Sequence, residues 1–449
     1  MARDNTLEKL GQLKMNATYE KPLNLIFIAL LSGLIAMTSV HTKIAGAAWL
    51  CIVLGGAYAL CARTRLQQRD SSQSVLPHNP VVSVATAWLL FTTLALALKA
   101  VAVFYWNSGW EERHAEIRLF LGAVGSVGLL SYAMNGRLQV GLVLGLCSAC
   151  VAAFVLLFVY GGGGAPTNRI PWASGVSLLI LATLGAAFTV GTLQRVILVL
   201  SSGLAASGVI AFGETRGAYP VGVIWIIALV SMHITSHQKA TTPELIARKP
   251  KTKLWLAVGL LSLATLALWP SQDFFKGTMA RTETAITEID AYIQGDGASV
   301  NTTVGARLHM WSLSVPVILD NLPWGIGKDA RLAQIHRWGE ELNSPVISSL
   351  GHSHSEYLQT LLENGLWGLA SFLSYAAGML FAARRLWQSN LKVSAKAMVA
   401  ITAMHSLAEV TNMNFAHNYY PTLLSLSVAI TLLFAKIEAQ QRQHSIKTT

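Results

Sequence analysis

The stretch HSHSEYLQTLLENGLWG, residues 352–368, joins a long polar segment to a strongly apolar one. If it forms one helix, its spacings of three, four and seven residues place His354, Leu358, Leu361, Gly365 and Gly368 on a single face. Glycines on that face would let another backbone or an acyl chain approach closely. A membrane protein that works on a lipid-linked substrate would place an ionisable side chain at such a boundary.

The composition predicts an all-α polytopic membrane protein. Of 449 residues, 53% are hydrophobic and only 12% are charged, whereas soluble domains are about a quarter charged. Many apolar runs reach the ~20 residues that a membrane-spanning helix needs. The net charge of +11 does not indicate nucleic-acid binding, because the basic residues gather between the apolar runs. All four cysteines fall inside apolar runs, so we expect no disulfide framework.

The apolar runs predict about twelve transmembrane helices. They lie roughly at 22–41, 44–61, 80–105, 118–136, 138–160, 173–192, 196–213, 220–237, 254–270, 364–383, 396–410 and 420–435. With a cytoplasmic N-terminus, the connections on the inner side hold most of the lysines and arginines, as the positive-inside rule requires. Both termini are therefore expected in the cytoplasm. The polar N-terminus up to Lys21 lacks a signal-peptide layout.

One connection, residues 271–363, is too long to be a simple linker, and loops of that length are usually functional. We expect helices at 277–293, 305–320 and 328–342, with the proline- and glycine-containing Asn321–Gly327 as a turn. The predicted topology places this module in the periplasm or at the cell exterior. The chain thus divides into transmembrane helices 1–9 (1–270), the large loop module (271–363), and transmembrane helices 10–12 with a cytoplasmic tail (364–449).

Bond-making outside the membrane has no ATP available and needs an activated donor, such as a sugar on a polyprenyl pyrophosphate. Arg216 lies in a very short outside turn, and its fork suits phosphate oxygens. It could instead pair with Glu214 or snorkel to lipid headgroups. Arg307 shares a helix face with Trp311 and would point at the protein or membrane; it could instead stack on Trp311 as a surface arginine.

His354 is the best candidate for a general base, because imidazole titrates near neutral pH. It could instead be a helix-terminal residue with local hydrogen bonds and Ser353 as the cap. His352 competes for the same role. The weaker candidates are Lys99, Arg281, Trp311, His309, Lys328 and His417. Among them, Lys99 is expected to snorkel, and Arg281 could reach a phosphate.

We expect neither a metal ion nor a cofactor. The first outside loop, His41–Lys43, has no acidic residue, although metal-dependent enzymes on lipid-linked sugars need carboxylates. Glu288 and Asp290 are the nearest acidic pair in the large loop, and a solvated helix face accounts for them.

Several of these residues resemble one known family. His354-Ser355, nine residues, Gly365, two residues and Gly368 are similar to the signature of the O-antigen ligase and polymerase superfamily. Thr215-Arg216-Gly217 resembles its arginine turn. Arg307, Trp311 and the Asn321–Gly327 turn resemble its large periplasmic loop. The resemblance covers roughly residues 195–435 and is greatest to the O-antigen ligases.

The resemblance implies a metal-independent, inverting glycosyltransferase with a GT-C-like fold. It would move O-antigen from undecaprenyl pyrophosphate to lipid A–core, at the periplasmic face of a Gram-negative inner membrane. His354 would be the base, with Ser355, Gly365 and Gly368 completing the motif. Arg216 and Arg307 would bind the pyrophosphate and stabilise its developing charge. The implied partners are this donor, this acceptor and the bilayer, with no nucleic acid.

Two other readings remain open. An O-antigen polymerase or a protein O-oligosaccharyltransferase of the same superfamily would share the donor and differ in the acceptor. A lipid-linked oligosaccharide flippase also has about twelve spans, but it needs no long outside loop. Essential residues in the outside loop would indicate a transferase, and essential residues in mid-span a flippase.

Overall fold

The computed structural model describes residues 25–69, 80–108, 114–131, 136–238 and 273–448, and every regular element in these ranges is helical. The helices that form the bundle are α2 (Thr42–Arg69), α3 (Pro80–Tyr105), α4 (His114–Ser131), α5 (Gly136–Tyr160), α6 (Arg169–Ala187), α7 (Thr192–Phe212), α8 (Pro220–Gln238), α14 (Glu356–Gln388), α15 (Lys392–Ala408) and α16 (Tyr419–Thr448). A further group comprises α10 (Asp273–Ile293), α11 (Gly305–Asp320), α12 (Lys328–Glu341) and α13 (Pro345–Ser348). The all-α prediction is confirmed.

Eight helices in the described part are long and apolar enough to cross a membrane, which confirms a polytopic membrane protein. They are α2, α3, α5 with the short helix Gly161–Gly164, α6, α7, α8 with the short helix η3 (Arg216–Ala218), α14 and α16. Three more of the predicted spans correspond to shorter or less apolar helices, namely Leu25–Ala36, α4 and α15. The span predicted at 254–270 lies outside the described residues, as does the basic cluster at 249–253. The count of twelve stays a prediction.

Helices α6 and α16 lie at the centre of the bundle, since 94% of the apolar window of each is buried. Around them, α14 packs along α3, and α2 packs along α4. The second pair relies on glycine: a Cβ atom on Gly56 would lie 2.1 Å from the Gly125 carbonyl oxygen, and one on Gly128 would lie 2.0 Å from that of Gly56. Small residues let two membrane helices approach to backbone contact, which strengthens their van der Waals packing.

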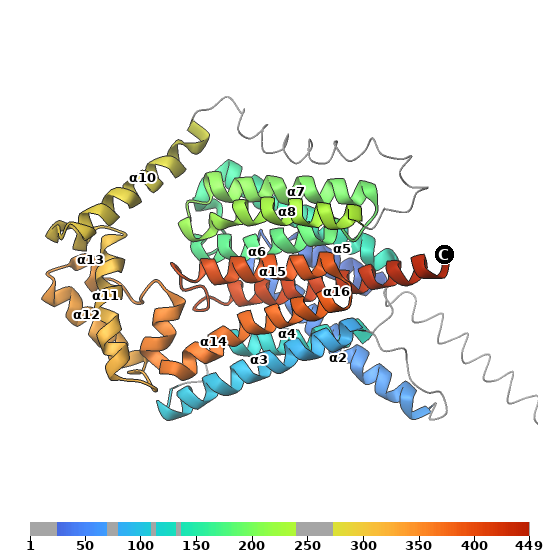
Figure 1. The fold of residues 1–449 in the computed structure, drawn as a ribbon, viewed down its shortest axis with the longest axis horizontal. Coiled ribbons are helices and arrows are strands. Elements are labelled where there is room, and N and C mark those ends of the chain that lie inside the picture. The colour runs from blue at the N-terminus through green and yellow to red at the C-terminus, as the bar shows by residue number, and fades with distance from the viewer. Residues whose placement is uncertain (1–24, 70–79, 109–113, 132–135, 239–272, 449) are drawn as a thin grey trace, which may run out of the picture.

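Helices α10 to α13 gather at one end of the bundle, and the C-terminal end of α16 projects from the other (Figure 1). The helices predicted at 277–293, 305–320 and 328–342 are present with nearly those bounds. The group has its own apolar core, which includes Met310, Ile335 and Trp338. Leu362 from the start of α14 belongs to this core, so the group packs directly onto a bundle helix.

Helix α14 is broken at Gly365, where φ is 58° and ψ is −143°. The break frees two carbonyl groups, and the turn after α11 uses them: Ile326 N–H donates to the Leu362 oxygen at 2.8 Å and Gly327 N–H to the Glu363 oxygen at 3.0 Å. In return, Leu366 N–H donates to the Pro323 oxygen at 2.9 Å. The Asn321–Gly327 turn is therefore docked into the break.

This geometry corrects the single helical face predicted for His354, Leu358, Leu361, Gly365 and Gly368. The helix begins at Glu356, after His354, and it breaks at Gly365. His354 therefore lies outside the helix and does not share a helical face with Gly365 or Gly368. The two glycines serve close packing instead: a Cβ on Gly365 would lie 2.0 Å from the Pro323 oxygen, and one on Gly368 would lie 2.7 Å from the Thr360 oxygen.

We predict that Gly365→Ala destabilises the protein by about 2 kcal/mol or more, because an L-residue is strained at this φ and ψ and its methyl group would meet Pro323. Thermal unfolding in detergent would measure the loss. Gly297→Ala is the matched control, since a Cβ there meets nothing within 4 Å. Equal unfolding temperatures for the two variants would contradict the role of the break.

Candidate functional site

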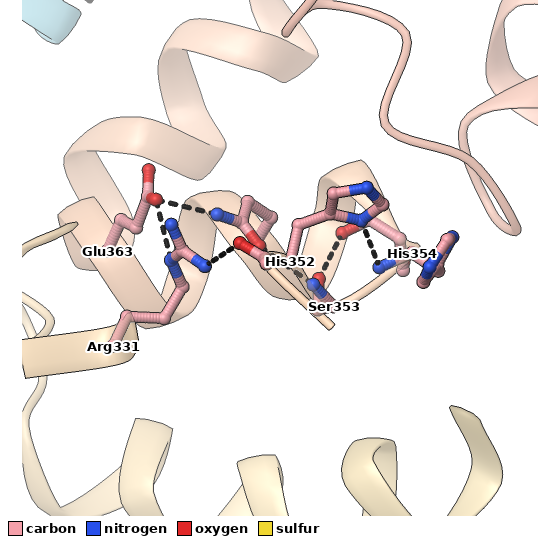
Figure 2. Close-up of polar contacts among 8 residues, drawn as sticks. Arg331, His352, Ser353, His354 and Glu363 are labelled. Carbon is pink, nitrogen blue, oxygen red and sulfur yellow. Dashed lines mark hydrogen bonds and ion pairs between the residues drawn. The ribbon is translucent and has the colours of Figure 1, made fainter. Parts of the chain in front are cut away.

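The two histidines lie in a turn just before α14. His354 has a left-handed backbone conformation, with φ of 55°, which is uncommon for a residue other than glycine. Its N–H donates to Nδ1 of His352 at 3.3 Å, and the two ring centroids are 4.1 Å apart. The turn thus presents both imidazoles together, as Figure 2 shows.

Ser353, between the histidines, is fully buried and uses every polar group. Its N–H donates to Gln359 Oε1 at 3.0 Å, its hydroxyl donates to the Ser355 carbonyl at 2.9 Å, and its own carbonyl accepts from Trp311 Nε1 at 2.7 Å. Ser353 is therefore not the helix cap considered from the sequence; Ser355 holds the N-cap position, without a side-chain cap bond. These bonds fix the histidine turn from both sides.

A largely buried ion pair lies to one side of the turn and supports it (Figure 2). Arg331, only 4% exposed, contacts Glu363 through Nε at 2.7 Å and donates to the Gly351 carbonyl. Gln359 Nε2 donates to the same Glu363 oxygen at 2.6 Å. The sequence reasoning missed this network. Its one local signal was the four-residue spacing of Gln359 and Glu363, which places them together on a helix.

Arg216 opens the short helix η3 beside the end of α7. It does not pair with Glu214, because that carboxylate is occupied by Arg169 and by Arg281, the latter at 2.8 Å. Instead, Arg216 Nη2 donates to the Arg281 carbonyl at 2.9 Å. Arg281, a weaker candidate, therefore anchors α10 to the Arg216 turn through Glu214. It also positions Arg216.

Arg307, on α11, lies close enough to Arg216 for the two charges to repel. Burial, and then the Arg216 charge, lowers the pKa of Arg307, and Glu288 partly offsets this. Within the described residues, neither guanidinium forms an ion pair with a carboxylate. The stacking of Arg307 on Trp311 considered from the sequence is not among the cation–π contacts of the described part. Two guanidinium groups without an ion-pair partner in this part make the pair a candidate anion site.

The electrostatics of the histidines link them to this anion site. The pKa of His354 is lowered to about 2, by burial first, then by the Arg307 charge and by His352. The pKa of His352 is lowered to about 4 by burial and by Arg331, Arg307 and His417. Both imidazoles are therefore neutral at neutral pH, which is the form that accepts a proton. Arg307 thus lies within electrostatic range of Arg216, of His354 and of His352, all of which were candidates from the sequence.

The loop between α15 and α16 joins the arginine turn to the histidine turn, and the sequence reasoning missed it. Glu356 N–H, directly after the histidine turn, is shared by the carbonyls of Glu409 at 3.0 Å and Asn412 at 3.1 Å. The Asn412 side chain packs against Gly217 so closely that a Cβ there would lie 2.0 Å from Nδ2. Glycine follows Arg216 because this contact leaves no room for a side chain.

Lys99 does not snorkel to the surface as expected. It is 9% exposed, on α3, and lies within electrostatic range of the buried Glu356. Glu116 of α4 is buried near the same carboxylate. Lys99 therefore contributes charge to the interior beneath the histidine turn. Within the described residues, no group of three or more histidines, cysteines or acidic residues is arranged to hold a metal ion.

Comparison with known families gives one match. Residues 201–373 match the family described as O-antigen ligase. The matched segment includes Arg216, Arg307 and His354, and it confirms the resemblance seen in the sequence. Residues 201–373 are thus similar to the O-antigen ligase family. No curated protein matches the chain.

We predict that a reaction using His354 as its base has no acidic limb near pH 6.5. A lowered pKa keeps the imidazole unprotonated as the pH falls, so the proton-accepting form is lost only far below neutral pH. The dependence of kcat/KM on pH, which reports the free enzyme, should be flat between about pH 8 and 5.5. An activity loss with an apparent pKa near 6.5 would contradict the buried, neutral imidazole.

Proposed function

We propose that this chain, through its O-antigen ligase domain, transfers O-antigen glycan from undecaprenyl pyrophosphate to the lipid A–core oligosaccharide. The reaction would take place at the periplasmic face of the inner membrane. The observation that carries the proposal is the pair of half-buried arginines, Arg216 and Arg307. They have no carboxylate partner among the described residues, and Arg307 lies near a neutral imidazole.

The two arginines would bind the donor pyrophosphate. Their mutual repulsion destabilises the empty site, and a diphosphate would relieve it while forming charge-assisted hydrogen bonds. Charge on the pyrophosphate grows as it leaves the sugar. Preorganised positive groups favour that transition state, and removing one such donor typically costs about 100- to 1,000-fold in rate. This pair would provide the charge stabilisation without a metal ion.

His354 would be the general base. The acceptor hydroxyl oxygen attacks the anomeric carbon, the bond from that carbon to the pyrophosphate oxygen breaks, and its electron pair leaves with the pyrophosphate. The hydroxyl proton passes to His354. Attack opposite the leaving group inverts the anomeric configuration. The bonds of Ser353 and the Arg331–Glu363 pair would hold the imidazole at the reacting hydroxyl.

The arrangement of the helices supports the proposed orientation. The α10–α13 group lies at one end of the bundle, and the C-terminal end of α16 lies at the other (Figure 1). With basic connections on the C-terminal side, the positive-inside rule would place both termini in the cytoplasm and the proposed site in the periplasm. A site at the end of the bundle also fits a transferase better than a flippase, whose substrate must pass between the spans.

We predict that His354→Ala abolishes transfer, since loss of a general base costs about 100- to 10,000-fold. The measurement is the profile of undecaprenyl-linked glycan and lipopolysaccharide in a deletion strain carrying each variant. Long glycan stranded on undecaprenyl pyrophosphate, with bare core, is the expected result. His336→Ala, an exposed imidazole on α12, is the matched control. Wild-type lipopolysaccharide together with normal protein glycosylation in the His354→Ala strain would remove the base assignment.

The same profile separates the alternatives that share this donor. In the His354→Ala strain, core bearing a single repeat would indicate an O-antigen polymerase. Normal lipopolysaccharide with an unglycosylated protein would indicate a protein O-oligosaccharyltransferase. Either result would be consistent with the proposed site but would assign a different acceptor.

We predict that Arg216→Lys lowers kcat by about tenfold or more, because a point charge replaces a fork that matches phosphate oxygens. The fork here donates one bond to Arg281 and has further N–H groups for the donor. Single-turnover transfer with purified protein would measure the effect, with Arg337→Lys on α12 as the exposed control. A wild-type rate for Arg216→Lys would favour a role at lipid headgroups.

A further inference from the structure

The α15–α16 loop, residues 409–418, lies outside the matched segment 201–373, yet it is built into the site. Besides accepting from Glu356, the loop is fixed internally: the buried Glu409 carboxylate accepts from the N–H of Asn414 at 3.2 Å and from its side-chain amide at 3.1 Å. The loop is therefore a preformed wall of the site.

His417 extends from this wall toward the histidine turn. Its imidazole lies within electrostatic range of His352 and of His114 at the start of α4. Arg307, by contrast, acts on both His352 and His354. Arg307 on α11 and His417 on the α15–α16 loop therefore both lie near the histidine turn.

The proposed function, on which the assignment below rests, has a stereochemical consequence. In an inverting displacement, the attacking oxygen approaches the anomeric carbon from the side opposite the leaving group. If Arg216 and Arg307 hold the leaving pyrophosphate, the acceptor must enter from the other side of the anomeric carbon. The groups near the histidine turn that this donor would not use are His352, His417 and the outer end of α4.

Arg118, on α4, contacts Asn418, the residue that follows His417. Its Nε donates to Asn418 Oδ1 at 3.3 Å and its Nη1 to Thr422 Oγ1 at 3.2 Å, and its guanidinium lies 5.4 Å from the centre of the Trp49 ring. All these partners are neutral. Arg331 and Arg281, in contrast, pair with carboxylates. Arg118 is thus held in place with its charge uncompensated within the described part, and N–H donors remain for an anion.

We propose that Arg118 and His417 form the acceptor-binding side of the site, with Arg118 contacting an anionic group, phosphate or carboxylate, on the acceptor glycolipid. His417 faces the acceptor sugar beside His352. The proposal assigns the two substrates to different surfaces: the donor to Arg216 and Arg307, and the acceptor to α4 and the α15–α16 loop.

Steady-state transfer with purified full-length protein in nanodiscs of zwitterionic lipid tests this assignment. The probes are an undecaprenyl-pyrophosphate glycan, a phosphorylated lipid A–core, and the same core after phosphatase treatment. For Arg118→Gln we expect the KM for the phosphorylated acceptor to rise about tenfold, with the donor KM unchanged and little change for the dephosphorylated acceptor. His417→Ala should raise the KM for both acceptors. Arg337→Gln and His336→Ala, both exposed on α12, are the matched controls.

Four results for Arg118→Gln would overturn the assignment. The first two are an unchanged KM for the phosphorylated acceptor and a raised KM for the donor. The other two are an equal effect on the phosphorylated and dephosphorylated acceptors, and an effect that appears only when anionic lipid is present. The last would mean that Arg118 binds a lipid headgroup. A failure of the proposed function would give a different result, because wild-type protein would then transfer no glycan to either core. In that case both the proposed function and the acceptor assignment would be wrong. Size-exclusion profiles identify any variant that does not fold. If Arg118→Gln does not fold, Arg118→Met, which keeps much of the side-chain length and removes the charge, provides the same comparison.

Discussion

The site depends on one interruption in a helix. Where α14 breaks at Gly365, the carbonyls of Leu362 and Glu363 lose their partners within the helix and accept N–H groups from the turn after α11. A buried backbone carbonyl without a partner costs ~1–3 kcal/mol, so the break and the turn require each other. This contact fastens the α10–α13 group to a bundle helix. It thereby brings Arg307 on α11 close to a histidine turn at the start of α14.

The arginines at this end of the bundle fall into two classes with different physical roles. Arg331 and Arg281 have carboxylate partners, and they hold backbone in place: one supports the histidine turn, and the other ties α10 to the Arg216 turn. Arg216, Arg307 and Arg118 have no such partner within the described residues. A partly buried charge without a counter-charge is costly unless a ligand provides one. The paired and the unpaired arginines together form a set of charges that a bound anion would help to neutralise.

Sequence periodicity predicted the helices of the α10–α13 group well, but it failed at the start of α14 and at its break. The α11 helix has the predicted bounds, and α12 ends one residue earlier than expected. The prediction failed at His354, because a repeat of three, four and seven residues cannot reveal that a helix starts two residues later and breaks at a glycine. Lys99 was misjudged for a related reason: a lysine near the end of an apolar run is equally compatible with snorkelling and with burial against an acid on a distant helix.

The sequence by itself determined the class of protein. Hydrophobicity, length and charge asymmetry are properties of the local sequence, and they decide directly whether a segment enters a bilayer and in which orientation. It also made His354, Arg216 and Arg307 site candidates, partly through the resemblance to a known family. Only the tertiary structure decided which arginines are neutralised and that the α15–α16 loop lies against the histidine turn. Those facts arise from contacts between residues up to about two hundred positions apart, such as Gly217 and Asn412. No local pattern encodes such contacts, because each side chain meets its partner only after the bundle has packed.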